Sequence, residues 1–169
     1  MVSAQEFAQS WHRSLFENDM NHTWRLMTED FRRVVAQVAL GKAREHGQNV
    51  DAIVEALSSE SPERGDLSEF HAAAGAILQN ACVVPPALVG AGITARVEAP
   101  AFEVVRLYVL EDLSVDEHGY RYLPPDASAR ALTLITLADN IGSWEMAGIG
   151  SVMSPGWPPT VAWEPPATV

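Results

Sequence analysis

The chain is poor in cysteine and in basic residues, and it has no long apolar run. Its 169 residues include one cysteine, Cys82, and 11 Lys or Arg against 22 Asp or Glu. A single cysteine cannot form an internal disulfide, which favours a reducing compartment and a cytoplasmic location. Because no apolar run approaches about 18 residues and the first residues are polar, we expect neither a membrane span nor a secretory signal.

The shortage of basic residues arises late in the chain. Residues 1–50 contain six Lys or Arg and six Asp or Glu, whereas residues 51–169 contain five and sixteen, so the net charge of −11 belongs to the later part. Phosphate backbones and anionic lipid surfaces attract basic proteins, and we therefore expect no nucleic-acid partner and no membrane partner. An acidic surface instead suits a basic protein, whose binding would weaken with added salt.

Sequence motifs for metals, cofactors and covalent catalysis are missing as well. The glycines of Gly90-Ala91-Gly92 lack the third glycine and the following helix of a dinucleotide site, and neither a phosphate loop nor a serine nucleophile elbow is found. The histidines follow neither H-x-H nor H-E-x-x-H spacing: they are His12, His22, His46, His71 and His118. We therefore expect no bound metal and no cofactor.

Five helices are expected in the first half of the chain. Ser3 and Glu6 match a capping box, and the apolar residues that follow recur with a helical period. Thr28 is the expected N-cap of the third helix, and Asp66 with Glu69 is the expected capping pair of the last one. The helices predicted from these signals cover residues 4–17, 20–27, 29 to a stop at Gly41 or Gly47, 51–58 and 67–81.

Strand patterns replace the helical period after residue 85. Alternating residues predict strands over 93–98 and 104–110, and a turn is expected at 116–119. The clearest local signal is an antiparallel hairpin of residues 130–138 and 143–152, which are joined by turn residues. The first strand of this hairpin has apolar residues on both faces, so we expect its outer face to be covered too.

The order of these elements predicts an α+β fold, with N-terminal helices packed on a curved, mainly antiparallel C-terminal sheet. We expect a single domain over residues 1–154 and an extended, proline-rich tail over 155–169. Five of the eleven prolines lie in the last fifteen residues. Such a tail is either pinned to its own domain by Trp157 and Trp163, or it presents the P-x-x-P pattern that begins at Pro155 to a partner.

Two stretches of the sequence resemble a known superfamily. The N-terminal WHRSLFENDMNHTWRLMTEDFR and the C-terminal ALTLITLADNIGSWEMAGIGSV look like the opening helices and the final hairpin of the NTF2-like superfamily, which includes ketosteroid isomerase-like and polyketide cyclase-like proteins. The two stretches cover about a quarter of the chain. The resemblance implies a cone-shaped fold with an apolar pocket at its mouth, and a homodimer formed through the sheet. It implies no particular reaction.

The residues leave three interpretations of function open. We favour a non-catalytic module that binds a small apolar ligand or a protein partner, with Trp11, Trp24, Tyr108 and Trp144 as candidate contacts, although core packing also explains these aromatic residues. The alternative is a cofactor-independent isomerase, cyclase or dehydratase acting on a hydrophobic substrate, with Tyr108 as proton donor and Glu145 as base. The third is an acidic subunit that docks a basic protein.

Overall fold

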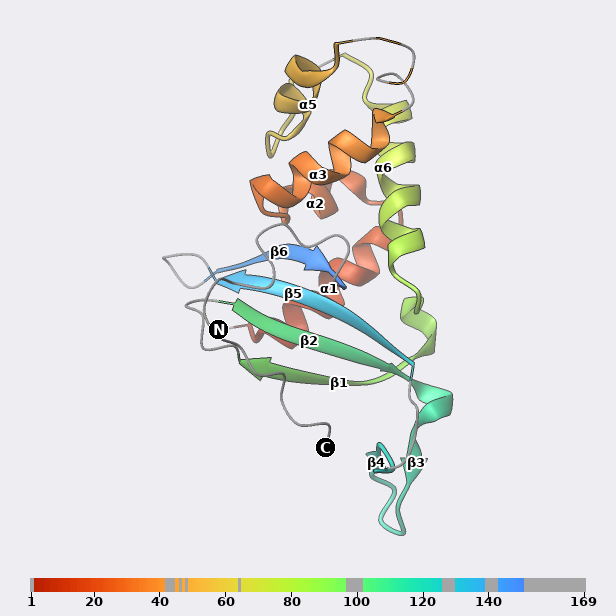
Figure 1. Ribbon diagram of the computed structural model, residues 1–169. Coiled ribbons are helices and arrows are strands. Elements are labelled where there is room, and N and C mark those ends of the chain that lie inside the picture. The colour runs from red at the N-terminus through yellow and green to blue at the C-terminus, as the bar shows by residue number, and fades with distance from the viewer. Residues whose placement is uncertain are drawn as a thin grey trace.

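Helices occupy the first half of the chain and strands the second, as the sequence predicts (Figure 1). The computed structural model describes residues 2–41, 45, 47, 49–63, 65–96, 102–125, 130–138 and 143–150. A four-stranded antiparallel sheet curls along the first helix, and a separate two-stranded hairpin projects beyond the end of the sheet. The protein therefore belongs to the α+β class.

The helices begin within one residue of the positions that the sequence predicts. They are α1 (Ala4–Phe16), α2 (Met20–Arg25), α3 (Glu29–Ala39), α5 (Asp51–Leu57) and α6 (Ser68–Ala81). The capping box of Ser3 and Glu6 is present, and the Thr28 hydroxyl accepts the N–H of Phe31. The expected cap of α6 is wrong, because Asp66 accepts the N–H of Ser68 in a tight turn before the helix and Glu69 takes no part.

The strands form one sheet in the order β1-β2-β5-β6, with every neighbour antiparallel. Its members are β1 (Val89–Arg96), β2 (Phe102–Val109), β5 (Ala131–Ala138) and β6 (Trp144–Ile149). The predicted hairpin is confirmed as β5 and β6. Its turn at 139–142, its last two residues and the tail over 155–169 lie outside the described residues.

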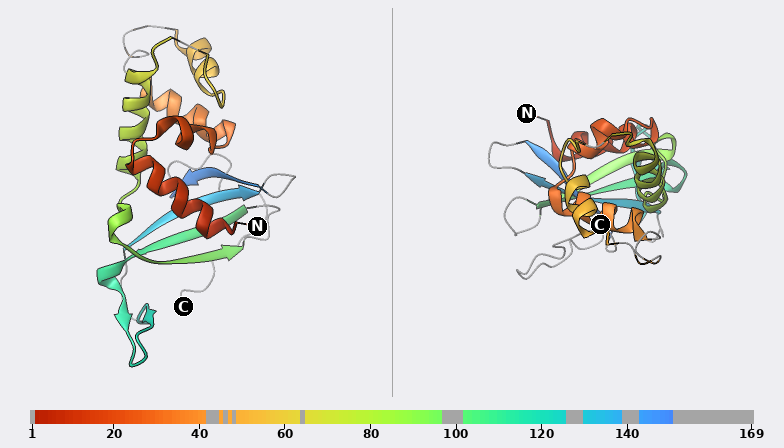
Figure 2. Two further views of the ribbon diagram at one scale, coloured as in Figure 1. Left: turned by 180° about the vertical axis from the view of Figure 1, so that it is seen from behind. Right: turned by 90° about the horizontal axis from the view of Figure 1, so that it is seen from above.

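The main core lies between α1 and the concave face of the sheet (Figure 2). Trp11 and Leu15 of α1 are fully buried in one cluster with Val105, Leu107 and Leu134 of the sheet. These sheet residues belong to the inward-facing set, since side chains alternate between the two faces of a strand. The first helix thus packs against the concave face of the sheet.

The opposite face of the sheet is buried as well. Val104, Tyr108 and Ile135 alternate with the inward-facing residues, and none of them is more than 8% exposed. Burial on both faces agrees with the apolar pattern of the β5 segment, which predicted a covered outer face. The central strands are therefore held on two sides.

The connection between α2 and α3 closes the open edge of β6. Thr28 donates its N–H to the carbonyl of Met146 at 2.9 Å, and Met146 donates its own to Leu26 at 2.7 Å. Met27 completes this short parallel bridge to Met146. An unpaired edge strand can recruit other chains, so this pairing protects β6 and ties the helices to the sheet.

A second group of helices extends beyond the sheet at one end of the molecule (Figure 1). The indole N–H of Trp24 in α2 donates to the carbonyls of Leu57 and Ser59, at 3.1 Å each. The buried guanidinium of Arg32 in α3 donates to the carbonyls of Ser58 and Met27. These bonds anchor the end of α5 to α2 and α3. No helix among the described residues is long and apolar enough to cross a membrane.

Candidate interaction site

The aromatic residues predicted to bind a ligand do not come together in any hollow lined by described residues. Trp11 is fully buried and donates its indole N–H to the Thr23 carbonyl at 3.1 Å, and Trp24 is equally buried. Trp144 packs against the core and donates to the Val2 carbonyl at 3.0 Å. A buried tryptophan usually finds such a partner for its N–H. Core packing and chain anchoring therefore account for these three residues.

The candidate acid and base are not brought together. Tyr108 of β2 pairs with Ala131 at one end of β5, whereas Glu145 of β6 pairs with Leu137 near the other end. Six residues of strand separate these two positions on β5, which corresponds to about 20 Å. Tyr108 and Glu145 therefore do not form a single site for proton transfer.

Three hollows lined by described residues all lie among the helices. The first, of about 430 Å³, lies between the start of α2 and α6, and the second, of about 340 Å³, adjoins it through the shared residues Asn21 and His71. The third, of about 450 Å³, lies beside Arg32. Trp24 is the only one of the four predicted ligand contacts that lines any of them.

The chemistry of these hollows is mixed. Burial lowers the pKa of His71, which favours a neutral imidazole where the first two hollows meet. Glu60 and Arg25 line the second hollow and carry opposite charges, while Glu29 and Glu55 stand at the third beside Arg32. Within the described part of the chain, no group of three or more His, Cys, Asp and Glu could hold a metal ion. The hollows thus offer scattered polar groups without an evident catalytic arrangement.

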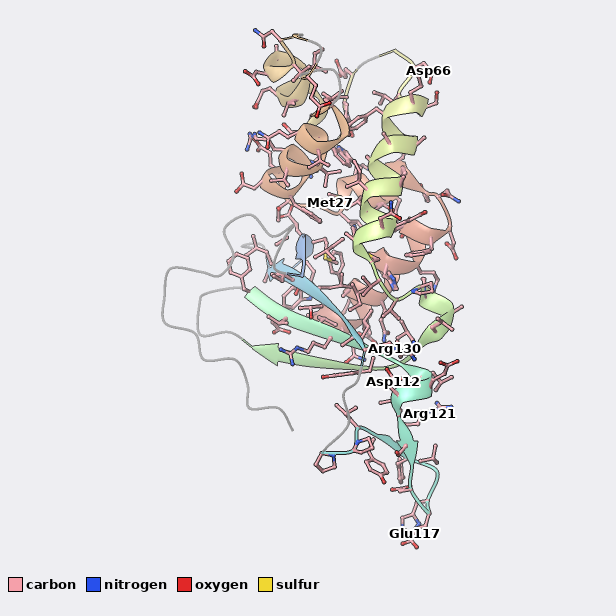
Figure 3. The ribbon with its side chains drawn as sticks, turned by 45° about the vertical axis from the view of Figure 1, so that its right-hand side comes forward. Met27, Asp66, Asp112, Glu117, Arg121 and Arg130 are labelled. Carbon is pink, nitrogen blue, oxygen red and sulfur yellow. The ribbon has the colours of Figure 1, made fainter. Side chains whose placement is uncertain are left out.

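A different surface stands out at the opposite end of the molecule. Residues 113–123, here called the arm, contain strands β3 (Ser114–Val115) and β4 (Arg121–Tyr122), and they project away from the body (Figures 1 and 3). The carboxylate of Asp116 accepts the N–H groups of His118 and Tyr120, at 2.9 and 2.8 Å. Gly119 adopts a φ of +85°, a left-handed value that favours glycine. The turn predicted at 116–119 is thus confirmed.

The arm exposes large apolar and aromatic side chains. Tyr120 is 72% exposed, Tyr122 49% and Val115 60%. In the ladder, Ser114 lies opposite Tyr122, and Val115 lies opposite Arg121. Because alternate residues share a face, both tyrosines lie on one face of the arm, and Val115 lies on the other.

An ion-pair cluster fixes the root of the arm (Figure 3). Arg130, just before β5, donates through Nε and Nη2 to the two carboxylate oxygens of Asp112 at 3.0 and 2.9 Å, and its backbone N–H donates to the same carboxylate at 2.8 Å. Nη2 also contacts Glu111 at 3.2 Å. These hydrogen bonds hold the pKa of the Asp112 carboxyl below its usual value. Two-pronged pairs of this kind fix orientation as well as distance.

Apolar exposure continues onto the root of the arm. Leu110 begins η2 (Leu110–Asp112), the short 3-10 turn before β3, and Leu88 ends η1 (Pro86–Leu88) before β1. Both leucines are exposed, and Gly90 of β1 lies so close to η2 that a Cβ atom there would lie 2.6 Å from the Leu110 Cα. Four of the eight exposed large apolar side chains among the described residues therefore belong to the arm and to η2 at its root: they are Leu110, Val115, Tyr120 and Tyr122. Such a concentration is typical of an interaction surface.

Comparisons with protein-family models, with curated proteins and with solved structures found no match. Function therefore has to be argued from the surfaces of this chain. The sequence predicts the turn of the arm, but it does not mark Tyr120 and Tyr122 as binding residues. The one signal for these tyrosines is that they alternate along a strand beside the turn. The strands β3 and β4 have only two residues each, so they are too short to reach a core.

Proposed function

We propose that this chain is a non-catalytic protein-binding module whose partner binds the arm and its root. The observation that carries the proposal is the pair Tyr120 and Tyr122, which are exposed on one face of a hairpin that projects from the body. Tyrosines combine a large apolar area with a polar tip, and they are enriched in the centres of protein interfaces. A ligand-binding role for the concave face has less support, because α1 packs against that face and the hollows lined by described residues lie elsewhere.

The open edges and the fixed orientation of the arm also favour a docking role. Each strand of a two-stranded ribbon has an open edge, along which another chain can pair. The arm pairs only β3 with β4 among the described strands, while Arg130 holds its root in one orientation. A partner that covered the tyrosines would therefore bind a preoriented element and lose little conformational entropy.

Other expectations stay predictions. They are the resemblance to the NTF2-like superfamily, a homodimer through the sheet and the cytoplasmic location. The enzyme interpretation lacks a supporting arrangement, because its two candidate residues lie far apart along the sheet.

Cross-linking from the arm tests the proposal. Glu117 is well exposed at the tip, and a Glu117→Cys variant would carry a benzophenone label there. The native Cys82 should stay unlabelled, because burial raises the pKa of its thiol to about 12. In extracts of the cells that make this protein, we expect a discrete adduct that disappears when Tyr120→Ser and Tyr122→Ser are added.

The matched control carries Val38→Ser and Val83→Ser, since these two residues are exposed and lie outside the arm. This control should retain the adduct at the level of the labelled parent. Identical adducts from the tyrosine variant and the parent would contradict the proposal. Circular dichroism of all variants checks that the fold is intact.

A further inference from the structure

We infer that the arm binds a basic, extended peptide segment, which adds as a third strand along β4 and places Arg or Lys side chains on the tyrosine face. This inference rests on the proposed function and adds the chemistry of the partner. Four observations carry it: the charge of the arm, its open edge, the position of the tyrosines, and the charge of the whole chain.

The charge of the arm and its root is predominantly negative. Between residues 110 and 123 there are four carboxylates and one arginine, and Arg130 at the root pairs with two of the carboxylates, so the arm and its root keep a net charge of −2. The side chains of Glu111 and Glu117 are 73% and 86% exposed, and they mark the root and the tip of the arm. Figure 3 shows Glu117 at the far end and Asp112 next to Arg130 at the base. A bound segment that spans the arm therefore has acidic groups near both of its ends.

The edge of β4 is suited to pairing with another strand. The small sheet contains β3 and β4 alone among the described strands, so the outer edge of β4 has no strand partner there. An extended peptide gains affinity from main-chain hydrogen bonds along such an edge, and its side chains give the specificity. Tyr120 and Tyr122 both lie on the β4 side of the hairpin, so they become the cross-strand neighbours of an added strand.

The tyrosine face then selects the side chains of the peptide. Every second residue of an added strand points toward the face of Tyr120 and Tyr122. A guanidinium or ammonium group stacks favourably on a tyrosine ring, and Arg is enriched in interfaces for this reason among others. On the opposite face, the added strand neighbours Arg121 of β4, which disfavours further basic residues at the positions in between. The expected pattern therefore has a basic residue at every second position.

The net charge of the chain disfavours a second copy of the same chain as the partner that binds the arm. A second copy would bring the same acidic arm and the same net charge of −11 to the contact. Like charges across an interface disfavour association, whereas a basic segment would be attracted from a distance. Sixteen of the acidic residues lie after residue 50, in the part of the sequence that contains the arm.

Peptide display on the purified full chain tests this inference. A random twelve-residue library is selected on the wild-type protein and counter-selected on the Tyr120→Ser, Tyr122→Ser variant. We expect the enriched peptides to carry Lys or Arg at alternate positions. Their affinity should fall by about tenfold between 50 and 300 mM NaCl, because exposed charge pairs are screened by salt.

Charge variants locate the contact. Glu117→Gln and Glu111→Gln should each weaken the selected peptides about threefold or more. Glu63→Gln removes the same charge from an exposed position outside the arm and should leave the affinity unchanged. Equal losses from all three variants would mean that general attraction, and not the arm, binds the peptides, which overturns the inference.

The remaining outcomes separate the inference from the proposed function. Arm-dependent peptides that are neutral or acidic, or whose affinity ignores salt, overturn the basic partner and leave a docking arm in place. Sedimentation that shows a dimer lost in the tyrosine variant, with no peptide enriched, makes a second copy the occupant and also overturns the inference. If neither peptides nor a dimer depend on the tyrosines, the inference is overturned, and the cross-linking from residue 117 decides separately whether the arm docks a folded partner.

Discussion

His12 is a titratable residue that α1 carries into the interior. It is 1% exposed, its Nε2 atom has no hydrogen-bond partner among the described residues, and its ring meets the Phe16 ring edge-on at 5.2 Å between centroids. Burial lowers the pKa of His12 to about 4, and a hydrogen bond with the Val84 backbone opposes this shift without cancelling it. His12 is therefore neutral in the folded protein at physiological pH.

The pKa of His12 predicts an acid-sensitive contribution to stability. The unfolded side chain titrates near 6.5, so acidification protonates the unfolded chain first and favours unfolding between pH 6.5 and about 4. The total loss is about 3 kcal/mol. A His12→Asn variant keeps a donor near Val84 but does not titrate. Urea unfolding at pH 7, 5.5 and 4.5 should show the stability gap between wild type and variant narrowing; a gap that stays constant would contradict this.

The roles of the candidate residues could not be decided from sequence patterns alone. Trp11 and Trp24 carry the same periodic signal whether they fill a core or line a pocket, so the sequence left both interpretations open. Tyr108 and Glu145 could be placed in strands, but their separation depends on strand order and register. The tyrosines of the arm lack any pattern of burial, and only the projection of the hairpin makes them conspicuous.

Elements were predicted best where the signal is local. The capping box of Ser3 and Glu6, the cap at Thr28 and the turn residues around Gly119 act through hydrogen bonds and backbone angles within a few residues. These signals predicted the starts of α1 and α3 and the turn of the arm. The way η2 and the arm meet the sheet depends on a contact between residues 90 and 110, which no local pattern encodes.

We predict that Gly90 fixes the position of the arm relative to the sheet. It lies at a register shift in β1, and a Cβ atom at this position would approach the backbone of Leu110. Gly90→Ala should therefore force β1 and η2 apart and lower the free energy of unfolding by about 1–3 kcal/mol. Urea unfolding measures the loss, and hydrogen exchange should quicken in the arm.

Gly65→Ala is the matched control for this variant. A Cβ atom at residue 65 would have no neighbour within 4 Å, and its backbone is not left-handed. This variant should stay within about 0.5 kcal/mol of the wild type. If both glycine variants were equally stable, the close approach of β1 and η2 would not restrain the arm.

At the scale of the molecule, the buried core and the arm are separate. The core cluster draws on α1, α2, α3, α5, α6 and the four-stranded sheet, and it contains no residue from 113–123. The molecule thus combines a body stabilised by packing with an appendage stabilised by a turn and by the Arg130 cluster. Changes in the arm should weaken binding and leave the stability of the body unchanged. Changes in the body should lower stability and leave binding unchanged.

This separation predicts that the body folds without the arm. Replacing residues 113–123 by a short Gly-Ser linker should keep a single cooperative transition, with a Tm within about 3 °C of the wild type, because the core cluster is intact. The same variant should lose every arm-dependent ligand.

Trp24→Phe should do the reverse: it leaves the carbonyls of Leu57 and Ser59 without their donor, which lowers stability by about 1–3 kcal/mol and leaves binding unchanged. Calorimetry and peptide binding on both variants check this pair of effects. A linker variant that failed to fold would make the arm part of the core, and its exposed tyrosines would then no longer mark a separate docking element.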